Sequence, residues 1–220
     1  NLIYDPVFTL DGAEAFCVGE LLDFIDTDVY KKQEGVPGPG TTKEEWDNLI
    51  ALAKEDEQLC SLRIVEKQND KKTGAKALCF YWEEGKEAIV VFAGTGYNEW
   101  RDDLIAGAKE DSKQQLDALE WFDALPYEKI TVSGHSKGGN KAMYVAVRSE
   151  KEPVCIAFDG EGFSKEFCQK YEEQIQKRKE NITLYANYRD FVNCLLYPIA
   201  GTVVFLKNDG GIAEDELGFG

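Results

Sequence analysis

The sequence predicts an α/β protein with a mostly parallel central sheet, helices on both faces and antiparallel strands at one edge. From residue 113 to residue 206, helix-like and strand-like segments alternate, a pattern typical of parallel sheets. Between residues 60 and 94, three strand-like runs are joined only by short turns, which favours antiparallel hairpins. Its 220 residues fit one domain.

The elements follow in order along the chain. We expect a helical N-terminal part at 1–59, in which residues 11–25 have helical apolar spacing and Thr42 and Glu45 form a capping box. The sheet core then spans 60–220. Its strands are expected at 60–68, 75–84, 87–94, 129–134, 153–160, 181–188 and 202–206, and its helices at 113–125, 138–149 and 165–179.

Four polar loops follow predicted strands, with the sequences "GTGYNEW", "GHSKGG", "FDGEGF" and "NYRDFVN". In a parallel sheet the carboxyl ends of the strands share one edge, and ligands bind beyond that edge. The sequence therefore predicts a functional site where these loops meet.

Composition excludes several classes of partner. The formal net charge is −16, so the chain repels nucleic acid and anionic membrane surfaces. No apolar run reaches the length of a membrane span. The six cysteines form no CxxC pair, and Cys79 and Cys155 fall in apolar strands, which favours free thiols, no metal site and a cytoplasmic location. An even cysteine count leaves disulfides open, and removal of a signal peptide would leave secretion open.

"GHSKG", from Gly134 to Gly138, matches the G-x-S-x-G nucleophile elbow between a strand and a helix. Glycines are needed there because the sharp turn crowds the strand against the helix. Ser136 is placed at the helix N-terminus, where backbone N–H groups favour a developing negative charge. An ordinary glycine-rich turn is the alternative interpretation.

An oxyanion requires two donors. The backbone N–H of Lys137, directly after the serine, is one candidate. The loop in "VVFAGTGYNEWRDDL" follows an earlier strand and supplies the other, with the Thr95 hydroxyl as an additional donor.

These segments carry a family resemblance. "VVFAGTGYNEWRDDL", "ITVSGHSKGGNKA", "IAFDGEGF" and "LYANYRDFVN" appear in the same order as four motifs of class 3 (fungal-type) lipases, and the wording is closest to a poorly characterised bacterial lipase-like branch. The resemblance covers about residues 75–206. In the first segment the matching positions are Gly94, Thr95, Trp100, Asp103 and Leu104.

The resemblance implies an α/β-hydrolase fold that needs no cofactor. It implies that Ser136 is the nucleophile, that Thr95 and Lys137 form the oxyanion hole, and that Asp190 is the triad acid. Two positions depart from the family pattern. Ala93 stands where the family commonly has arginine or a similar residue, and no histidine lies between Asp190 and Gly220.

The only histidine, His135, adjoins the serine. Successive side chains of a strand point in opposite directions, so we expect His135 to point away from the substrate and to pack beneath the turn as a structural residue. In α/β-hydrolases the histidine follows the acid. We therefore expect the native chain to continue past Gly220 and to carry the base there.

For the acid, Asp159 competes with Asp190, since both end strands; Asp190 is favoured and Asp159 is expected to shape its own turn. Asp102 and Asp103 are expected to anchor a helix. The predicted function is ester hydrolysis of the lipase or esterase type. Alternatives are an inactive hydrolase-like binding module, or a thioesterase, peptidase or acyltransferase. The polar stretch "AGAKEDSKQQ" favours a small acyl ester or a lysophospholipid over a triglyceride.

Overall fold

A computed structural model describes residues 3, 5–9, 11–25, 42–70, 75–94, 111–187 and 196–207. Its centre is a seven-stranded sheet in which the strands lie in sequence order, β1 to β7. The first three strands pair antiparallel and the remaining pairs are parallel, as predicted. The strands are β1 (Arg63–Asp70), β2 (Ala75–Trp82), β3 (Glu87–Phe92), β4 (Ile130–His135), β5 (Val154–Phe158), β6 (Ile182–Asn187) and β7 (Thr202–Leu206).

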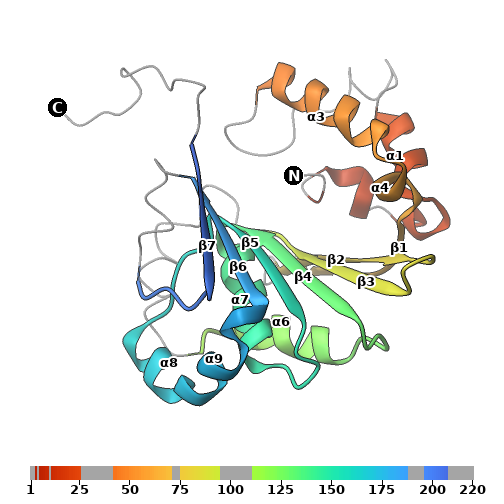
Figure 1. Cartoon of the computed structure of the whole chain (residues 1–220). Helices are drawn as coiled ribbons and strands as arrows, with labels where there is room; N and C mark the ends of the chain where they lie inside the picture. Colours follow the sequence, from red (N-terminus) through yellow and green to blue (C-terminus); the bar gives the residue numbers. More distant parts are fainter. Residues whose placement is uncertain are drawn as a thin grey trace.

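Helices lie on both sides of the sheet (Figure 1). The N-terminal helices pack near β1, and the other helices lie on the opposite side, below the sheet in this view. The first group is η2 (Pro6–Thr9), η3 (Ala13–Ala15), α1 (Val18–Ile25), α3 (Lys43–Glu55) and α4 (Glu57–Ser61). The second group is α6 (Lys113–Asp123), α7 (Lys137–Arg148), α8 (Lys165–Lys170), α9 (Glu172–Arg178) and η4 (Lys179–Asn181).

The alternation of side chains along the strands divides the core in two. Val90 and Phe92 of β3 point to the α6–α7 side and join its cluster. Their neighbours Ile89 and Val91 pack against the N-terminal cluster on the other side. Because β3 contributes to both clusters, its carboxyl end is held from both faces.

The predicted capping box is confirmed at the start of α3. The Thr42 hydroxyl accepts from the Glu45 N–H at 3.2 Å, and the Glu45 carboxylate accepts from the Thr42 N–H at 2.8 Å. Trp46 and Ile50 lie on the buried face of this helix. The capping box and the spacing of the apolar residues therefore both predict the helix α3.

The predicted helix at 165–179 is interrupted. It divides into α8 and α9 at Tyr171, whose backbone has φ −112° and ψ 24°. No glycine or proline marks the break. The Tyr171 ring instead packs on Phe167, with ring centroids 4.9 Å apart, and its hydroxyl donates to Asp111, 60 residues earlier. Tertiary contacts therefore accompany the break.

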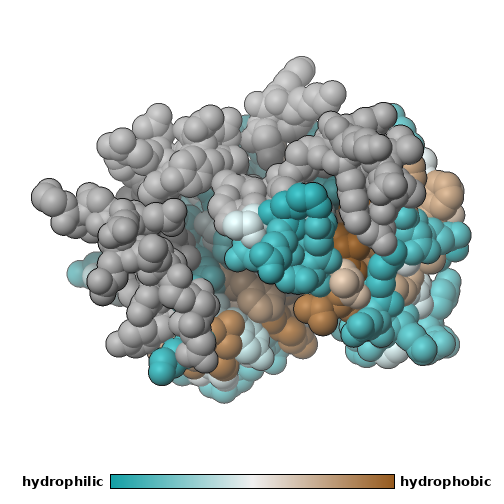
Figure 2. All heavy atoms as spheres, turned by 90° about the horizontal axis from the view of Figure 1, so that it is seen from above, coloured by the Kyte–Doolittle hydropathy of each residue, from teal (hydrophilic) through white to brown (hydrophobic). Residues whose placement is uncertain are grey.

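On the side of the sheet that carries the N-terminal helices, the second half of the sheet is partly exposed. Phe158 in β5 is 42% exposed, and its ring stacks on Tyr185 of β6, with centroids 5.5 Å apart. Figure 2 views the molecule from above and shows hydrophobic surface between its polar parts. In the strand register His135, Phe158 and Tyr185 lie in one row at the carboxyl end of the sheet.

Candidate active site at the carboxyl ends of the parallel strands

Ser136 occupies a sharp turn between β4 and α7, with φ 55° and ψ −125°. This conformation is rare for a residue with a side chain and costs on the order of 1–3 kcal/mol. The turn is held by two backbone bonds: the Ser136 N–H donates to the Phe158 carbonyl at 2.9 Å, and the Asn140 N–H donates to the Ser136 carbonyl at 3.1 Å. The predicted strand–turn–helix context of the serine is therefore present.

The hydroxyl of Ser136 is used differently from those of the other serines. Ser112 and Ser164 cap their helices through the side chain, whereas Ser136 is the N-cap residue of α7 and makes no such bond. The hydroxyls of Ser61, Ser133 and Ser149 also make hydrogen bonds. Ser136 is also only partly buried. Its hydroxyl lies at the N-terminus of α7 but does not cap the helix.

The glycines of the motif are required by contact. A Cβ at Gly134 would lie 2.3 Å from the carbonyl atoms of Gly138. A Cβ at Gly138 would lie 2.1 Å from the Phe92 carbonyl oxygen, at the end of β3. Backbone touches backbone at both positions, as the sequence pattern indicated.

Asp159, in the loop after β5, is tied to the end of β6. The Asp159 N–H donates to the Tyr185 carbonyl at 2.8 Å, and its carboxylate accepts from the Asn187 N–H at 2.5 Å. Asp159 has φ 45°. The sequence predicted that this carboxylate would shape its own turn; in the structure it fixes the end of the next strand. Two of the four predicted loops, those after β4 and β5, and the end of β6 thus meet within the described residues.

The predicted packing of His135 beneath the turn is wrong. Its side chain is 51% exposed, and its Nε2 lies 4.0 Å from the Asp159 Oδ2. The reason lies in the sheet: the row that continues His135 across β5 and β6 has no described helix packed over it, so nothing buries the imidazole. That His135 is not the general base remains a prediction.

Sequence reasoning missed a buried amide beside the elbow. The Asn140 Nδ2 donates to the carbonyls of Glu161 and Gly162 at 3.2 and 3.0 Å, and its Oδ1 accepts from the Gln115 Nε2 at 2.7 Å. The side chain links α7 to the β5 loop and to the start of α6. An amide side chain in the first turn of the elbow helix, directly after the two glycines, was the available signal.

Several predicted site residues lie outside the described residues. They are Thr95, Trp100, Asp102, Asp103, Leu104 and Asp190. The structure describes the strand ends that lead to these segments, Gly94 after β3 and Asn187 at the end of β6. Lys137 is the first residue of α7, directly after the serine, as predicted.

The described cysteines are free thiols, namely Cys17, Cys60, Cys79, Cys155 and Cys168; Cys194 lies outside the described residues. Burial raises the pKa of Cys79 to about 12 and also raises that of Cys155. These two thiols therefore stay protonated and weakly nucleophilic. Within the described ranges, no group of three or more histidine, cysteine or acidic residues is arranged to hold a metal ion. The helices of the same ranges are all too short or too polar to cross a bilayer.

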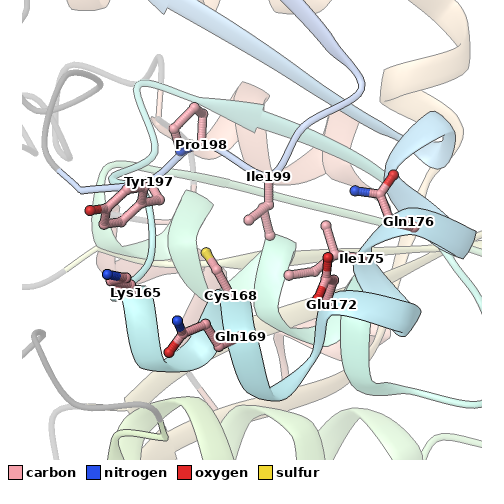
Figure 3. Close-up of a pocket in the computed structure, with 9 residues that line it drawn as sticks. All are labelled: Lys165, Cys168, Gln169, Glu172, Ile175, Gln176, Tyr197, Pro198 and Ile199. Carbon is pink, nitrogen blue, oxygen red and sulfur yellow. The ribbon is translucent and has the colours of Figure 1, made fainter.

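The structure also has a surface pocket (Figure 3). It has a volume of about 500 Å³ between α8, α9 and the segment before β7. Its described lining contains none of the predicted site residues: Lys165, Cys168, Gln169, Glu172, Ile175, Gln176, Tyr197, Pro198 and Ile199. The pocket is thus separate from the candidate site.

The elbow lies within a part of the chain that matches a known protein family. The model of the Mbeg1-like family matches residues 59–215, well over half of the chain. The chain belongs to the Mbeg1-like family. The matched region begins just before β1 and includes the elbow. No curated protein sequence matches this Mbeg1-like chain significantly.

Solved structures of fungal lipases resemble the Mbeg1-like chain in fold. The Lip2 lipase of Yarrowia lipolytica aligns with a TM-score of 0.50 at 14% identity, over 76% of this chain and 72% of its own. A triacylglycerol lipase of Penicillium expansum aligns at 0.49 and 16%, over 66% and 70%. The Rhizomucor miehei lipase–propeptide complex aligns at 0.41 and 18%, over 62% of this chain and only 52% of its own. With the sheet topology, the first likeness shows an α/β-hydrolase fold.

Proposed function

We propose that this protein is a serine hydrolase that cleaves carboxylic esters through an acyl-serine intermediate. The conformation of Ser136 carries the proposal: a strained, partly exposed serine stands at the N-terminus of a helix that its hydroxyl does not cap. Proteins keep such strain where it serves a function. The two glycine contacts around it have no other evident use.

In the proposed reaction the Ser136 Oγ attacks the ester carbonyl carbon and its proton passes to a histidine. The oxyanion accepts hydrogen bonds from the Lys137 N–H and from Thr95, each worth a few kcal/mol of barrier. The C–O bond then breaks, and the alcohol leaves with the proton from the histidine. Water, activated by the same histidine, releases the acid and restores the serine.

Asp190 is proposed to orient that histidine. The segment that carries Asp190 starts at Asn187, whose N–H is fixed by Asp159. Asp159 therefore anchors the strand end and leaves the triad role to Asp190. We propose a small acyl ester or a lysophospholipid as substrate, because the sequence between β3 and α6 is rich in charged and polar residues near α6.

Hydrolysis of p-nitrophenyl esters of increasing chain length, with lysophosphatidylcholine and a triglyceride emulsion alongside, tests this function. We expect turnover of the short esters or the lysophospholipid, and its loss in Ser136→Ala. Ser133→Ala is the matched control, since this serine lies on β4 and its hydroxyl donates to the Ile156 carbonyl at 2.7 Å. Equal activity in Ser136→Ala and the wild type would refute the proposal. Absence of activity toward every ester would favour the binding-module alternative.

A further inference from the structure

Lys141 is a buried lysine in the elbow helix. The residue is 5% exposed, and its Nζ donates to the backbone carbonyl of Ala93 at 3.1 Å. Burial of an ammonium group is costly unless it is hydrogen-bonded. An apolar residue at position 141 would pack without this cost, so the presence of a charged side chain there needs a physical reason.

The acceptor of this bond belongs to the residue that directly follows β3. Ala93 is 2% exposed, and its N–H donates to the Lys76 carbonyl of β2 at 3.0 Å. Its carbonyl is held by Lys141. Because both polar groups of Ala93 are bonded, the peptide that joins it to Gly94 has a fixed orientation.

A second contact reinforces the first. Gly138 lies three residues before Lys141, on the same side of α7, and its Cα packs against the Phe92 carbonyl so closely that a Cβ would lie 2.1 Å away. The helix that presents Ser136 at its N-terminus therefore touches the end of β3 twice. The first contact is between backbones, and the second is made by the ammonium group.

We propose that Lys141 is a positioning residue of the active site. It fixes the Ala93 carbonyl to α7, so that the peptide between Ala93 and Gly94 keeps a constant distance from the helix that begins at Ser136. The expected effect of Lys141 on catalysis rests on the proposed function. Ala93 has only a methyl group at the position where class 3 lipases, which the chain resembles, commonly have arginine or a similar residue, and Lys141 reaches the Ala93 carbonyl from the helix.

The test compares Lys141→Met with the wild type in the full chain. The first readout is the rate at which a fluorophosphonate labels the serine, a reaction that depends on the same oxyanion donors. We expect labelling and kcat to fall about ten- to a hundredfold, with KM within about twofold, because small misplacements of catalytic donors have effects of this size. The second readout is hydrogen exchange of the Ala93 and Gly94 amides, which should become faster in the variant.

Lys151→Met is the matched control, because the Lys151 Nζ also donates to a backbone carbonyl, that of Leu125, but Lys151 follows the C-terminal end of α7 and Leu125 precedes β4, at the ends of these elements away from the elbow. It should leave both readouts unchanged. Lys141→Arg should recover part of the rate, and Lys141→Gln, which ends one atom short, should not. These two variants decide the question if the methionine variant does not fold.

The outcomes separate the two proposals. A folded Lys141→Met or Lys141→Gln protein with wild-type labelling and wild-type exchange overturns the positioning role. A wild-type protein that is never labelled overturns the proposed function instead, and exchange at Ala93 and Gly94 then decides alone whether Lys141 braces the strand end.

Discussion

At the scale of single residues, substitutions of Ser136 test whether its backbone conformation lowers the stability of the protein. Glycine adopts φ 55° without strain, whereas alanine keeps the cost. We therefore expect Ser136→Gly to raise the free energy of unfolding by about 1 kcal/mol and Ser136→Ala to change it by less than about 0.5 kcal/mol. Urea unfolding measures both. A Ser136→Gly protein less stable than Ser136→Ala would contradict the account of strain.

The contact at Gly138 makes a second prediction. In Gly138→Ala the new methyl group would collide with the Phe92 carbonyl, and neither backbone can move freely, so we expect a loss of about 2–3 kcal/mol. Gly139→Ala is the matched control: its Cβ would lie 3.1 Å from its nearest neighbours, and the loss should be about 1 kcal/mol or less. Thermal or urea unfolding of the two variants gives the comparison. Equal losses of stability in the two variants would show that the close approach of α7 to β3 does not restrict the residue at position 138.

Individual residues also show what the sequence predicts well and what it does not. Ser136 and its glycines form a local pattern, and the structure has the local geometry that the pattern requires. The roles of Lys141 and Asp159 depend on partners 48 and 28 residues away. Side-chain alternation predicted a direction for His135 but not its exposure, which depends on what covers the sheet.

At the scale of elements, Asp111 joins three helices. Its carboxylate accepts hydrogen bonds from the Tyr144 hydroxyl at 2.6 Å, the Arg148 guanidinium at 3.0 Å, the Lys170 ammonium at 2.6 Å and the Tyr171 hydroxyl at 3.0 Å. The Arg148 guanidinium also lies 4.2 Å from the centre of the Tyr171 ring. One carboxylate thus links the chain before α6 to α7 and to the α8–α9 break.

The Asp111 network predicts a pH dependence. Burial acts to raise the pKa of Asp111, but hydrogen bonds from Lys170, Tyr144 and Tyr171 together outweigh it, so its pKa lies below the usual value of 3.8. A lowered pKa in the folded state stabilises the protein above about pH 4, and this contribution is lost as the pH falls through the folded-state pKa. Asp111→Asn should therefore cost about 2–3 kcal/mol at neutral pH, and less as the pH falls below about 4.

Urea unfolding at several pH values measures this effect. Asp117→Asn is the control, because Asp117 forms an exposed pair with Lys113 four residues earlier and should contribute less than about 0.5 kcal/mol. A difference between wild type and Asp111→Asn that stays constant from neutral pH to about pH 3 would contradict the titration argument.

The elements themselves were largely predictable. Apolar patterns predicted all seven strands and the helices α3, α6 and α7, most of which bury at least one face; β7 is the exception, because its apolar side chains are largely exposed. Periodicity did not predict the division of 165–179, since the residues on both sides of Tyr171 keep helical spacing. The division accompanies contacts with Asp111 and Arg148, which lie far away in the sequence.

At the scale of the whole molecule, the N-terminal helices share a core with the sheet. Leu22 and Trp46 belong to the same buried cluster as Leu78 of β2. We therefore expect the helical N-terminal part and the sheet core to unfold as one cooperative unit, as a single domain would. Variants that keep only Trp46 or only Trp121, on opposite sides of the sheet, should show the same urea midpoint. An earlier transition at Trp46 would indicate a separable N-terminal unit.

The order of strands and helices in the sequence predicted the architecture, because strands that alternate with helices can form a parallel sheet in only a few topologies. The site followed only in part. The sequence placed four loops at one edge, and the described residues bring together two of them, those that contain Ser136 and Asp159. The assignments of Thr95 and Asp190 remain predictions.

Reaction of the protein with a fluorophosphonate, followed by digestion and mass spectrometry of the adduct, tests the central claim most directly. The chain has six serines, and five of them use their hydroxyls in hydrogen bonds within the fold. We predict a single adduct on Ser136, absent after Ser136→Ala and unchanged after Ser133→Ala. An unlabelled protein, or an adduct on any other residue, would contradict the account.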